Sequence, residues 1–427
     1  MQTFIPPSFN LALNWTADLL HPFLLKAVQN IDEVEISDED KNMLRSLRDD
    51  RLLFFTNHPS TAEPPIVYKL GNIMGARFKY MASRQVFDWT FGLTGKVISN
   101  LGAYSIIAGI NDREALKTSR AVLAEPSGKL VLFPEGEPTS GENDSLMPFQ
   151  SGVAQIPFWA LDDARKQDPD ADITILSGFM KYIIKGPPRE TEQEIINYLA
   201  VLERKIGVNP GKRNLLRRFL HFGKVLLEQA EKEYNIPMAS EKDFEYRIGR
   251  VRHAILDGVA EKMKLKTYDK NADAIMKLRA LWAVVEMLMI EYPDEKLPKL
   301  TDKELDWAHR ELVKAFDLIV IKKEYLVSYP TPERFFEWLT RFESYVLGKK
   351  PRALGGEPSH LPRRAVVTFA KPFKLSEYYP KGLDKAGKKK ALADILERLR
   401  ADMQRQLDLS KNLTTPIVEP YDVGDEI

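Results

Sequence analysis

The feature that most limits the fold of this chain is a series of short apolar runs separated by segments of helical length. The clearest runs are residues 52–55, 130–133 and 173–179. They are shorter than a typical helix and contain few polar residues, so we expect strands that are buried on both faces. Buried strands that alternate with helices predict an α/β fold with a mainly parallel sheet covered by helices.

The same patterns place the other elements before residue 187 and after residue 361. We expect further strands at residues 77–82, 103–108 and 364–371, and helices at residues 9–28, 41–50, 84–100, 112–124, 149–165 and 384–407.

Between residues 187 and 361 strand patterns almost vanish and helix-start signals replace them. Thr191, Ser240 and Thr301 each stand three residues before an acid, and Thr331 precedes Pro332. We therefore expect an N-terminal helical segment (1–50), the first part of a core (51–186), a large all-helical insertion (187–361), the last strand and helix of the core (362–411) and a tail (412–427). A separate C-terminal domain is the alternative to a chain that returns to complete the sheet.

Composition narrows the classes of function. The 427 residues carry 62 basic and 61 acidic side chains, and this net charge of +1 argues against nucleic acid as a partner. Cys is absent, which excludes disulfides and thiolate chemistry. No stretch approaches the roughly 20 apolar residues that span a bilayer, and the start lacks a signal-peptide pattern. We expect a cytoplasmic protein.

Two segments raise the question of contact with a membrane surface. Residues 9–28 are rich in apolar and aromatic side chains, which suits either a helix lying on lipid or one packed on the core. In the helical block, basic residues alternate with apolar ones between residues 212 and 224. They suit docking on anionic lipid or an acidic carrier protein, or else a solvated helix face.

The chemistry begins directly after the first apolar run, where Asn57 and His58 are followed by Glu63. A histidine can accept a proton from a hydroxyl when an acceptor holds its other nitrogen. Glu63 is the nearest acceptor, and Pro64 after it predicts a helix start, where a carboxylate is favoured. A histidine with only a structural hydrogen bond is the alternative.

The second run ends in Pro134, Glu135 and Gly136. A carboxylate at this strand end can orient an acceptor hydroxyl. Gly136 permits close approach of a ligand or offers an N–H to a developing oxyanion. Taken alone, such a tripeptide also occurs in ordinary loops. The other histidines lack metal-ligand spacing and there is no nucleotide-binding glycine loop, so we expect neither a metal nor a resident cofactor.

Together these residues resemble the phospholipid/glycerol acyltransferase family, whose best-known members acylate lysophosphatidic acid. The family is marked by Asn-His, four residues and an acid, and by a later Phe-Pro-Glu-Gly. The resemblance covers residues 51–186 and 364–407 and does not reach the helical block. The two motifs stand here as Asn57, His58, Pro59, Ser60, Thr61, Ala62 and Glu63, and as Phe133, Pro134, Glu135 and Gly136.

The resemblance implies an O-acyltransferase of glycerolipid synthesis, similar to a 1-acylglycerol-3-phosphate O-acyltransferase. Acyl-CoA or acyl carrier protein would donate a fatty acyl group to the hydroxyl of a lysophospholipid-like acceptor. By carry-over, His58 is the general base and Glu63 its orienting carboxylate. Asn57, Glu135 and Gly136 would bind the acceptor or support the transition state. A thioester is already activated, so a covalent intermediate on Ser60 is the poorer hypothesis.

The chain departs from the family in three places. Glu63 replaces the usual Asp, and Ala108 and Pro138 stand where two phosphate-binding arginines are customary. Arg113 is a candidate replacement, with a solvated helix residue as the alternative interpretation. The acceptor head group therefore stays open. A catalytically weakened acyltransferase-fold protein that binds lipid or acts as a scaffold is the rival to an enzyme with peripheral contact on the inner face of a membrane.

Overall fold

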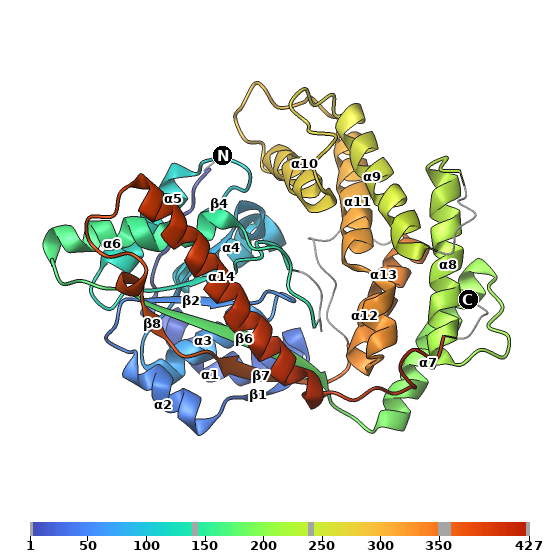
Figure 1. Cartoon of the computed structure of the whole chain (residues 1–427), viewed down its shortest axis with the longest axis horizontal. Coiled ribbons are helices and arrows are strands. Elements are labelled where there is room, and N and C mark those ends of the chain that lie inside the picture. The colour runs from blue at the N-terminus through green and yellow to red at the C-terminus, as the bar shows by residue number, and fades with distance from the viewer. Residues whose placement is uncertain (1–2, 139–143, 238–242, 349–359, 424–427) are drawn as a thin grey trace. The chain divides into compact units, whose positions relative to one another are not determined.

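The computed structural model describes residues 3–138, 144–237, 243–348 and 360–423. These residues divide into two compact units (Figure 1). The first comprises residues 3–138, 144–183 and 360–412, and the second comprises residues 184–237, 243–348 and 413–423.

The first unit is built on one mainly parallel sheet, as predicted. Its strand order is β1-β7-β6-β2-β5-β3-β4, with β8 paired to β6. β2 pairs in parallel with both β5 and β6, and β8 runs antiparallel to β6. The strands are β1 (Ile31–Glu35), β2 (Leu52–Thr56), β3 (Lys79–Ser83), β4 (Ala103–Ile106), β5 (Lys129–Leu132), β6 (Thr174–Ile184), β7 (Arg363–Phe369) and β8 (Phe373–Lys374).

Helices cover both faces of this sheet, because alternate residues of the buried strands point to opposite sides. Leu52 and Phe54 pack with α1, α2 and α3, whereas Leu53 and Phe55 pack with α5, α6 and α14. Figure 1 shows α14 crossing in front of the strands. These helices are α1 (Leu11–Gln29), α2 (Asp38–Ser46), α3 (Glu63–Met74), α4 (Leu93–Asn100), α5 (Arg113–Ala124), α6 (Ile156–Gln167) and α14 (Lys385–Ser410), with short 3₁₀ turns η1 (Arg84–Gly92), η2 (Ser151–Ala154), η3 (Leu375–Glu377) and η4 (Lys411–Leu413).

The chain leaves the sheet after β6 and returns to it with β7, which lies between β1 and β6. The described residues between these two strands form helices, so this segment is an insertion in an α/β fold, as the sequence indicated. α14 then buries Ile395, Leu399 and Met403 against the sheet face that carries Phe55.

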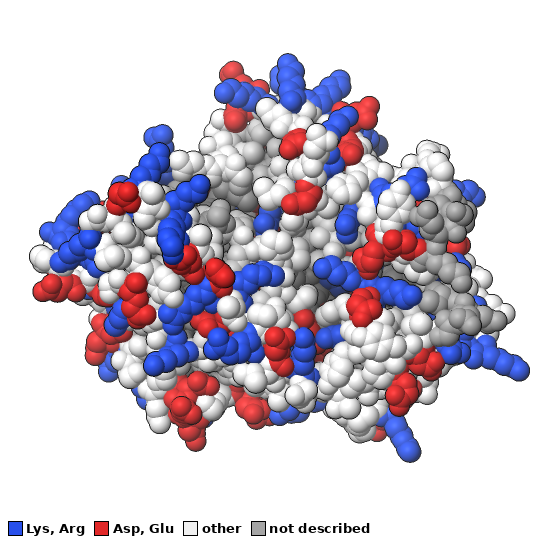
Figure 2. Space-filling view, in the orientation of Figure 1, with Lys and Arg blue, Asp and Glu red and all other residues white. Residues whose placement is uncertain are grey.

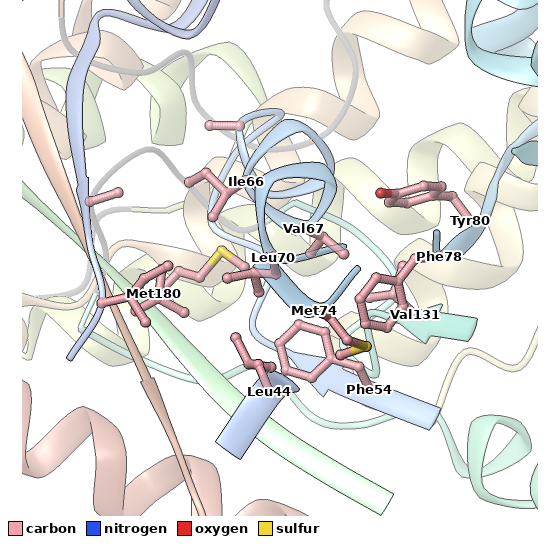
Figure 3. Packing of buried hydrophobic residues seen from close by; sticks show 14 of the residues in the cluster. Leu44, Phe54, Ile66, Val67, Leu70, Met74, Phe78, Tyr80, Val131 and Met180 are labelled. Carbon is pink, nitrogen blue, oxygen red and sulfur yellow. The ribbon is translucent and has the colours of Figure 1, made fainter. Parts of the chain in front are cut away.

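α3 begins beyond the carboxyl end of β2 and packs on one face of the sheet. Ile66, Val67 and Leu70 are fully buried in the cluster that contains Phe54 (Figure 3). Burying each such side chain contributes about 1.5–3 kcal/mol. This packing fixes the first residue of the helix, Glu63, relative to the end of β2.

The prediction of one helix over residues 84–100 is wrong. The segment is a 3₁₀ turn, η1, followed by α4, and Thr90 and Phe91 near the end of η1 have left-handed backbone angles. The chain doubles back so closely that a Cβ on Gly95 would lie 2.3 Å from the carbonyl oxygen of Phe87. A continuous helix would lose this packing.

An unexpected strand, β1, occupies part of the acidic stretch after α1. It pairs in parallel with β7, more than 300 residues later, and Arg364 lies 3.0 Å from the carboxylate of Glu35. The partner strand thus supplies a cation that local sequence does not reveal.

The second unit consists of helices in its described residues. Thr301 forms the predicted capping box with Glu304, and Thr331 caps its helix as predicted. The predicted start at Thr191 is wrong, because Pro187 and Pro188 begin that helix earlier. Ser240 lies outside the described residues, and Asp243 caps the helix that follows it. The helices are α7 (Pro188–Ile206), α8 (Leu215–Glu233), α9 (Phe244–Lys262), α10 (Ala274–Met289), α11 (Asp302–Val320), α12 (Lys323–Ser328) and α13 (Pro332–Leu347).

The basic cluster of residues 212–224 lies at the start of α8. Arg217 pairs with Asp422 at 2.9 Å and Arg218 pairs with Glu203. Leu216 and Phe219, which flank these two arginines in the sequence, are fully buried. Part of the cluster's charge is thus neutralised within the unit, and Figure 2 shows basic and acidic side chains interspersed over the face in view.

Among the described residues, none of the helices combines the length and apolar character needed to cross a lipid bilayer.

Candidate active site

The candidate site lies at the carboxyl end of the sheet, where the neighbouring strands β2 and β5 end beside β6. Register places Phe55 beside Leu132 and Thr56 beside Gly178. The residues that follow β2 and β5 therefore emerge next to each other. β6 continues beyond β2 and brings Met180 and Tyr182 to the same edge.

Asn57 fixes the end of β2. Its side-chain oxygen accepts from the N–H of Met180 at 2.8 Å, and its side-chain nitrogen donates to the carbonyl of Met180 at 3.0 Å. The amide thus continues the sheet pairing by one residue. In this structure Asn57 positions the backbone that leads into His58.

His58 and Glu63 lie within hydrogen-bond distance, with 2.8 Å between Nδ1 and Oε2. Nδ1 therefore donates to the carboxylate, and Nε2 carries the lone pair. The imidazole also stacks on Phe133, with ring centroids 4.3 Å apart. Its side chain is 14% exposed, whereas the Glu63 side chain is fully buried.

Glu63 stands at the first position of α3, as the sequence predicted. Pro64 and Pro65 follow in the first turn, where a missing N–H costs no helical hydrogen bond. Here the carboxylate also faces the positive end of the helix dipole.

Three donors besides His58 hold the Glu63 carboxylate. The backbone N–H of Ser60 donates to Oε2 at 3.0 Å, and the Ser60 hydroxyl donates to Oε1 at 3.0 Å. The hydroxyl of Tyr182 also donates to Oε1. Charge-assisted hydrogen bonds of this kind fix the orientation of a carboxylate strongly. Glu63 therefore holds the ring of His58 in one orientation.

Sequence reasoning missed Tyr182. It is buried in β6, 119 residues from Glu63. Burial and then the negative charge of Glu63 raise the pKa of Tyr182 well above its usual value, so its hydroxyl stays a donor. The only local signal was a polar pair, Lys181 and Tyr182, in an apolar strand.

The carboxylate of Glu135 links two backbone segments through hydrogen bonds. Its Oε1 accepts from the N–H of His58 at 2.9 Å, and its Oε2 accepts from the N–H of Met147 at 2.6 Å. Burial raises the pKa of Glu135 to about 7, although both hydrogen bonds oppose that shift. This geometry gives Glu135 a positioning role beside His58.

Gly136 forms the turn that carries Glu135. Its φ of +86° is left-handed, and a Cβ there would lie 1.8 Å from the Gln150 side-chain nitrogen. Its N–H donates to the carbonyl of Phe133 at 3.0 Å, so the turn itself uses that group. The need for glycine at this position is therefore conformational, whereas the end of the flexible Gln150 side chain could move away from a Cβ.

Arg113 is exposed at the start of α5, which follows β4, and β3 lies between β4 and β5. Within the described residues, no hydrogen bond or ion pair joins Arg113 to His58, Glu63 or Glu135.

The site is thus an oriented histidine at the carboxyl end of a parallel sheet, which is a general-base arrangement. Residues 35–175 match the family described as Acyltransferase, and this interval contains His58, Glu63, Glu135 and Gly136. The match supports an enzyme that transfers acyl groups. Comparison with curated proteins and with solved structures gave no match.

Proposed function

We propose that the protein transfers a fatty acyl group from a thioester, acyl-CoA or acyl carrier protein, to a hydroxyl of a lysophospholipid-like acceptor. The observation that carries this proposal is the contact of 2.8 Å between His58 Nδ1 and Glu63, which leaves Nε2 as the basic atom. The acyltransferase match over residues 35–175 supports the same chemistry.

In the proposed reaction Nε2 of His58 takes the proton of the acceptor hydroxyl as its oxygen attacks the thioester carbonyl. The carbon–oxygen bond forms, the carbon–sulfur bond breaks, and the proton passes to the departing thiolate. Glu63 stabilises the imidazolium that forms in between. No enzyme nucleophile is required, and the Ser60 hydroxyl is already engaged with Glu63 and with the N–H of Ala62.

The acceptor head group differs in this proposal from that of a typical lysophosphatidic acid enzyme. Ala108 and Pro138 stand in the customary arginine positions, and within the described residues no hydrogen bond or ion pair joins Arg113 to His58. Phosphate recognition relies on charge-assisted contacts, which neutral side chains cannot make. We therefore propose a lysolipid acceptor that is not recognised through those two contacts.

A surface in the first unit suits peripheral contact with lipid. α1 buries Asn14, His21 and Leu25 and exposes large apolar side chains. The exposed fraction is 67% for Trp15 and 81% for Leu19, and Phe91 near the end of η1 is fully exposed. Exposed aromatic and aliphatic side chains on one helix face suit the boundary between head groups and acyl chains. We propose that the enzyme meets its acceptor at the inner face of a membrane.

The test is a panel assay with lysolipids of different head groups and labelled acyl-CoA or acyl carrier protein. We expect one ester product, and a loss of about 10²–10⁴-fold in kcat for His58→Ala. His253→Ala, in the helical unit, is the matched control. Unchanged turnover in the His58 variant would contradict the mechanism. Lysolipid binding without any product would favour the rival function, a lipid-binding or scaffolding protein.

A further inference from the structure

The helical unit contains an apolar cavity that the proposed reaction does not use. Its volume is about 150 Å³, and it lies between α8, α9, α11 and α13. Protein interiors are close-packed, and an apolar cavity of this size can hold a benzene-sized molecule. The cavity therefore has the capacity of a binding site.

The cavity is elongated along α11. The lining residues Arg310, Val313, Lys314, Asp317, Leu318 and Ile321 follow one face of that helix. Eleven residue steps of about 1.5 Å give a length of about 16 Å. A cavity of about 150 Å³ along this face can take part of an extended alkyl chain, and the remainder of the chain would lie in the open part of the groove.

The walls are apolar, and solvent reaches them. Leu227, Val313, Trp338 and Phe342 line the cavity and are each 4–5% exposed. Fully sealed core residues of the same unit, such as Leu216, are 0% exposed. The cavity is only partly enclosed, so a molecule can enter it from outside.

Cations predominate among the charged groups of the lining. Several are already paired: Lys314 with Glu233, Arg310 with Asp306 and Arg341 with Asp317. The charged lining residues are Lys224, Arg310, Lys314, Lys323 and Arg341, with Asp317 as the one carboxylate.

Lys323 differs from the paired cations. Its ammonium lies 5.3 Å from the ring centre of Phe244, another lining residue. Within the described residues no carboxylate lies within ion-pair distance of this ammonium. An anion at this position would therefore gain a charge partner without breaking an existing ion pair.

We propose that the helical unit binds a single-chain amphiphile with an anionic head group. The acyl chain lies along α11 between Val313 and Phe342, and the head group contacts Lys323. This site is separate in sequence from the His58 site and does not depend on the proposed acyl transfer.

The test uses the full chain and a terminally brominated fatty acid, because bromine quenches tryptophan fluorescence on contact. We expect saturable quenching that is lost in Trp338→Phe, since Trp338 lines the cavity. The uncharged brominated alcohol should bind about tenfold more weakly. Competition with unlabelled fatty acid and lysophosphatidic acid then distinguishes a carboxylate from a phosphate head group.

Two variants separate the acyl-chain contact from the head-group contact. Val313→Trp fills the cavity and should abolish quenching. Lys323→Ala should raise the Kd about tenfold, whereas the matched Lys322→Ala, which replaces the exposed neighbour outside the lining, should not. The comparison of Lys323→Ala with Lys322→Ala remains a valid test if Val313→Trp misfolds.

The proposal is overturned if quenching persists in Trp338→Phe, if Lys323→Ala and Lys322→Ala bind alike, or if the cavity receives a second copy of the chain. The last case would appear as a dimer that Val313→Trp dissociates. His58→Ala should bind the fatty acid as the unmodified chain does. Failure of acyl transfer and failure of this site are therefore distinguishable.

Discussion

Tyr182 donates a hydrogen bond to the same Glu63 carboxylate that receives Nδ1 of His58. Tyr182, Glu63 and His58 form a chain of hydrogen bonds that runs from the buried strand β6 to the partly exposed imidazole. Because the carboxylate is fully buried, every donor it accepts from helps to fix its orientation.

Tyr182→Phe removes one charge-assisted donor and leaves the ring in place. We expect the free energy of unfolding to fall by about 1.5–3 kcal/mol, and kcat to fall while KM changes little. Tyr104→Phe is the matched control, because the buried hydroxyl of Tyr104 on β4 is hydrogen-bonded to that of Ser119 on α5 at 2.7 Å. That variant should lose stability and keep its kcat. Equal kcat in both variants would contradict a positioning role for Tyr182.

Glu63→Asp tests the longer acid that this chain uses. Aspartate keeps the charge but withdraws the carboxylate by one methylene, so it cannot reach His58, Ser60 and Tyr182 together. We expect a loss of about 10–100-fold in kcat, because small misplacements of reacting groups are costly. Glu63→Gln, which removes the charge, should lose more. Steady-state kinetics of both variants, with unfolding curves as a check, decide the order.

The contact between His58 and Glu63 was predictable because both its partners lie in one strand-loop-helix segment. The histidine follows an apolar run and the acid precedes Pro64, and these two local patterns are enough to predict the contact. The sheet was also predictable from local sequence, because a short and fully apolar run such as that of β2 has few alternatives to a buried strand.

Tyr182, β1 and the break at Phe91 were not predictable, because each depends on a distant or tertiary contact. Tyr182 reaches Glu63 only through the parallel register of β6 with β2. β1 is an acidic segment that becomes a strand because Arg364 and β7 lie beside it. The left-handed angles at Phe91 are set by the packing of α4 on η1, which no local pattern reports.

Gly136→Ala should damage both stability and activity. Its left-handed φ costs a non-glycine residue about 1–2 kcal/mol, and the new Cβ would displace Gln150. The turn carries Glu135, so we expect kcat to fall as well. Gly207→Ala is a matched control, because Gly207 has a φ of +72° with no atom near its Cβ position. That variant should lose stability by a similar amount and keep its kcat.

The buried Glu135 predicts a pH-dependent stability. Its pKa in the folded protein is about 7, against an ordinary value of 4.5. Between these values the unfolded chain has released the proton and the folded chain retains it. The free energy of unfolding should therefore fall as pH rises through this interval, by at most about 3 kcal/mol.

Glu135→Gln tests this pH dependence, because an amide does not titrate. The variant loses one acceptor for the N–H groups of His58 and Met147, so it should be less stable than the unmodified protein at about pH 5. That deficit should shrink or reverse at about pH 8, where the unmodified protein must ionise a buried carboxyl. Urea unfolding at both pH values measures the difference. Glu114→Gln, at an exposed position of α5, should leave the pH dependence unchanged. A deficit that stays constant between the two pH values would mean that Glu135 ionises as an ordinary carboxyl does.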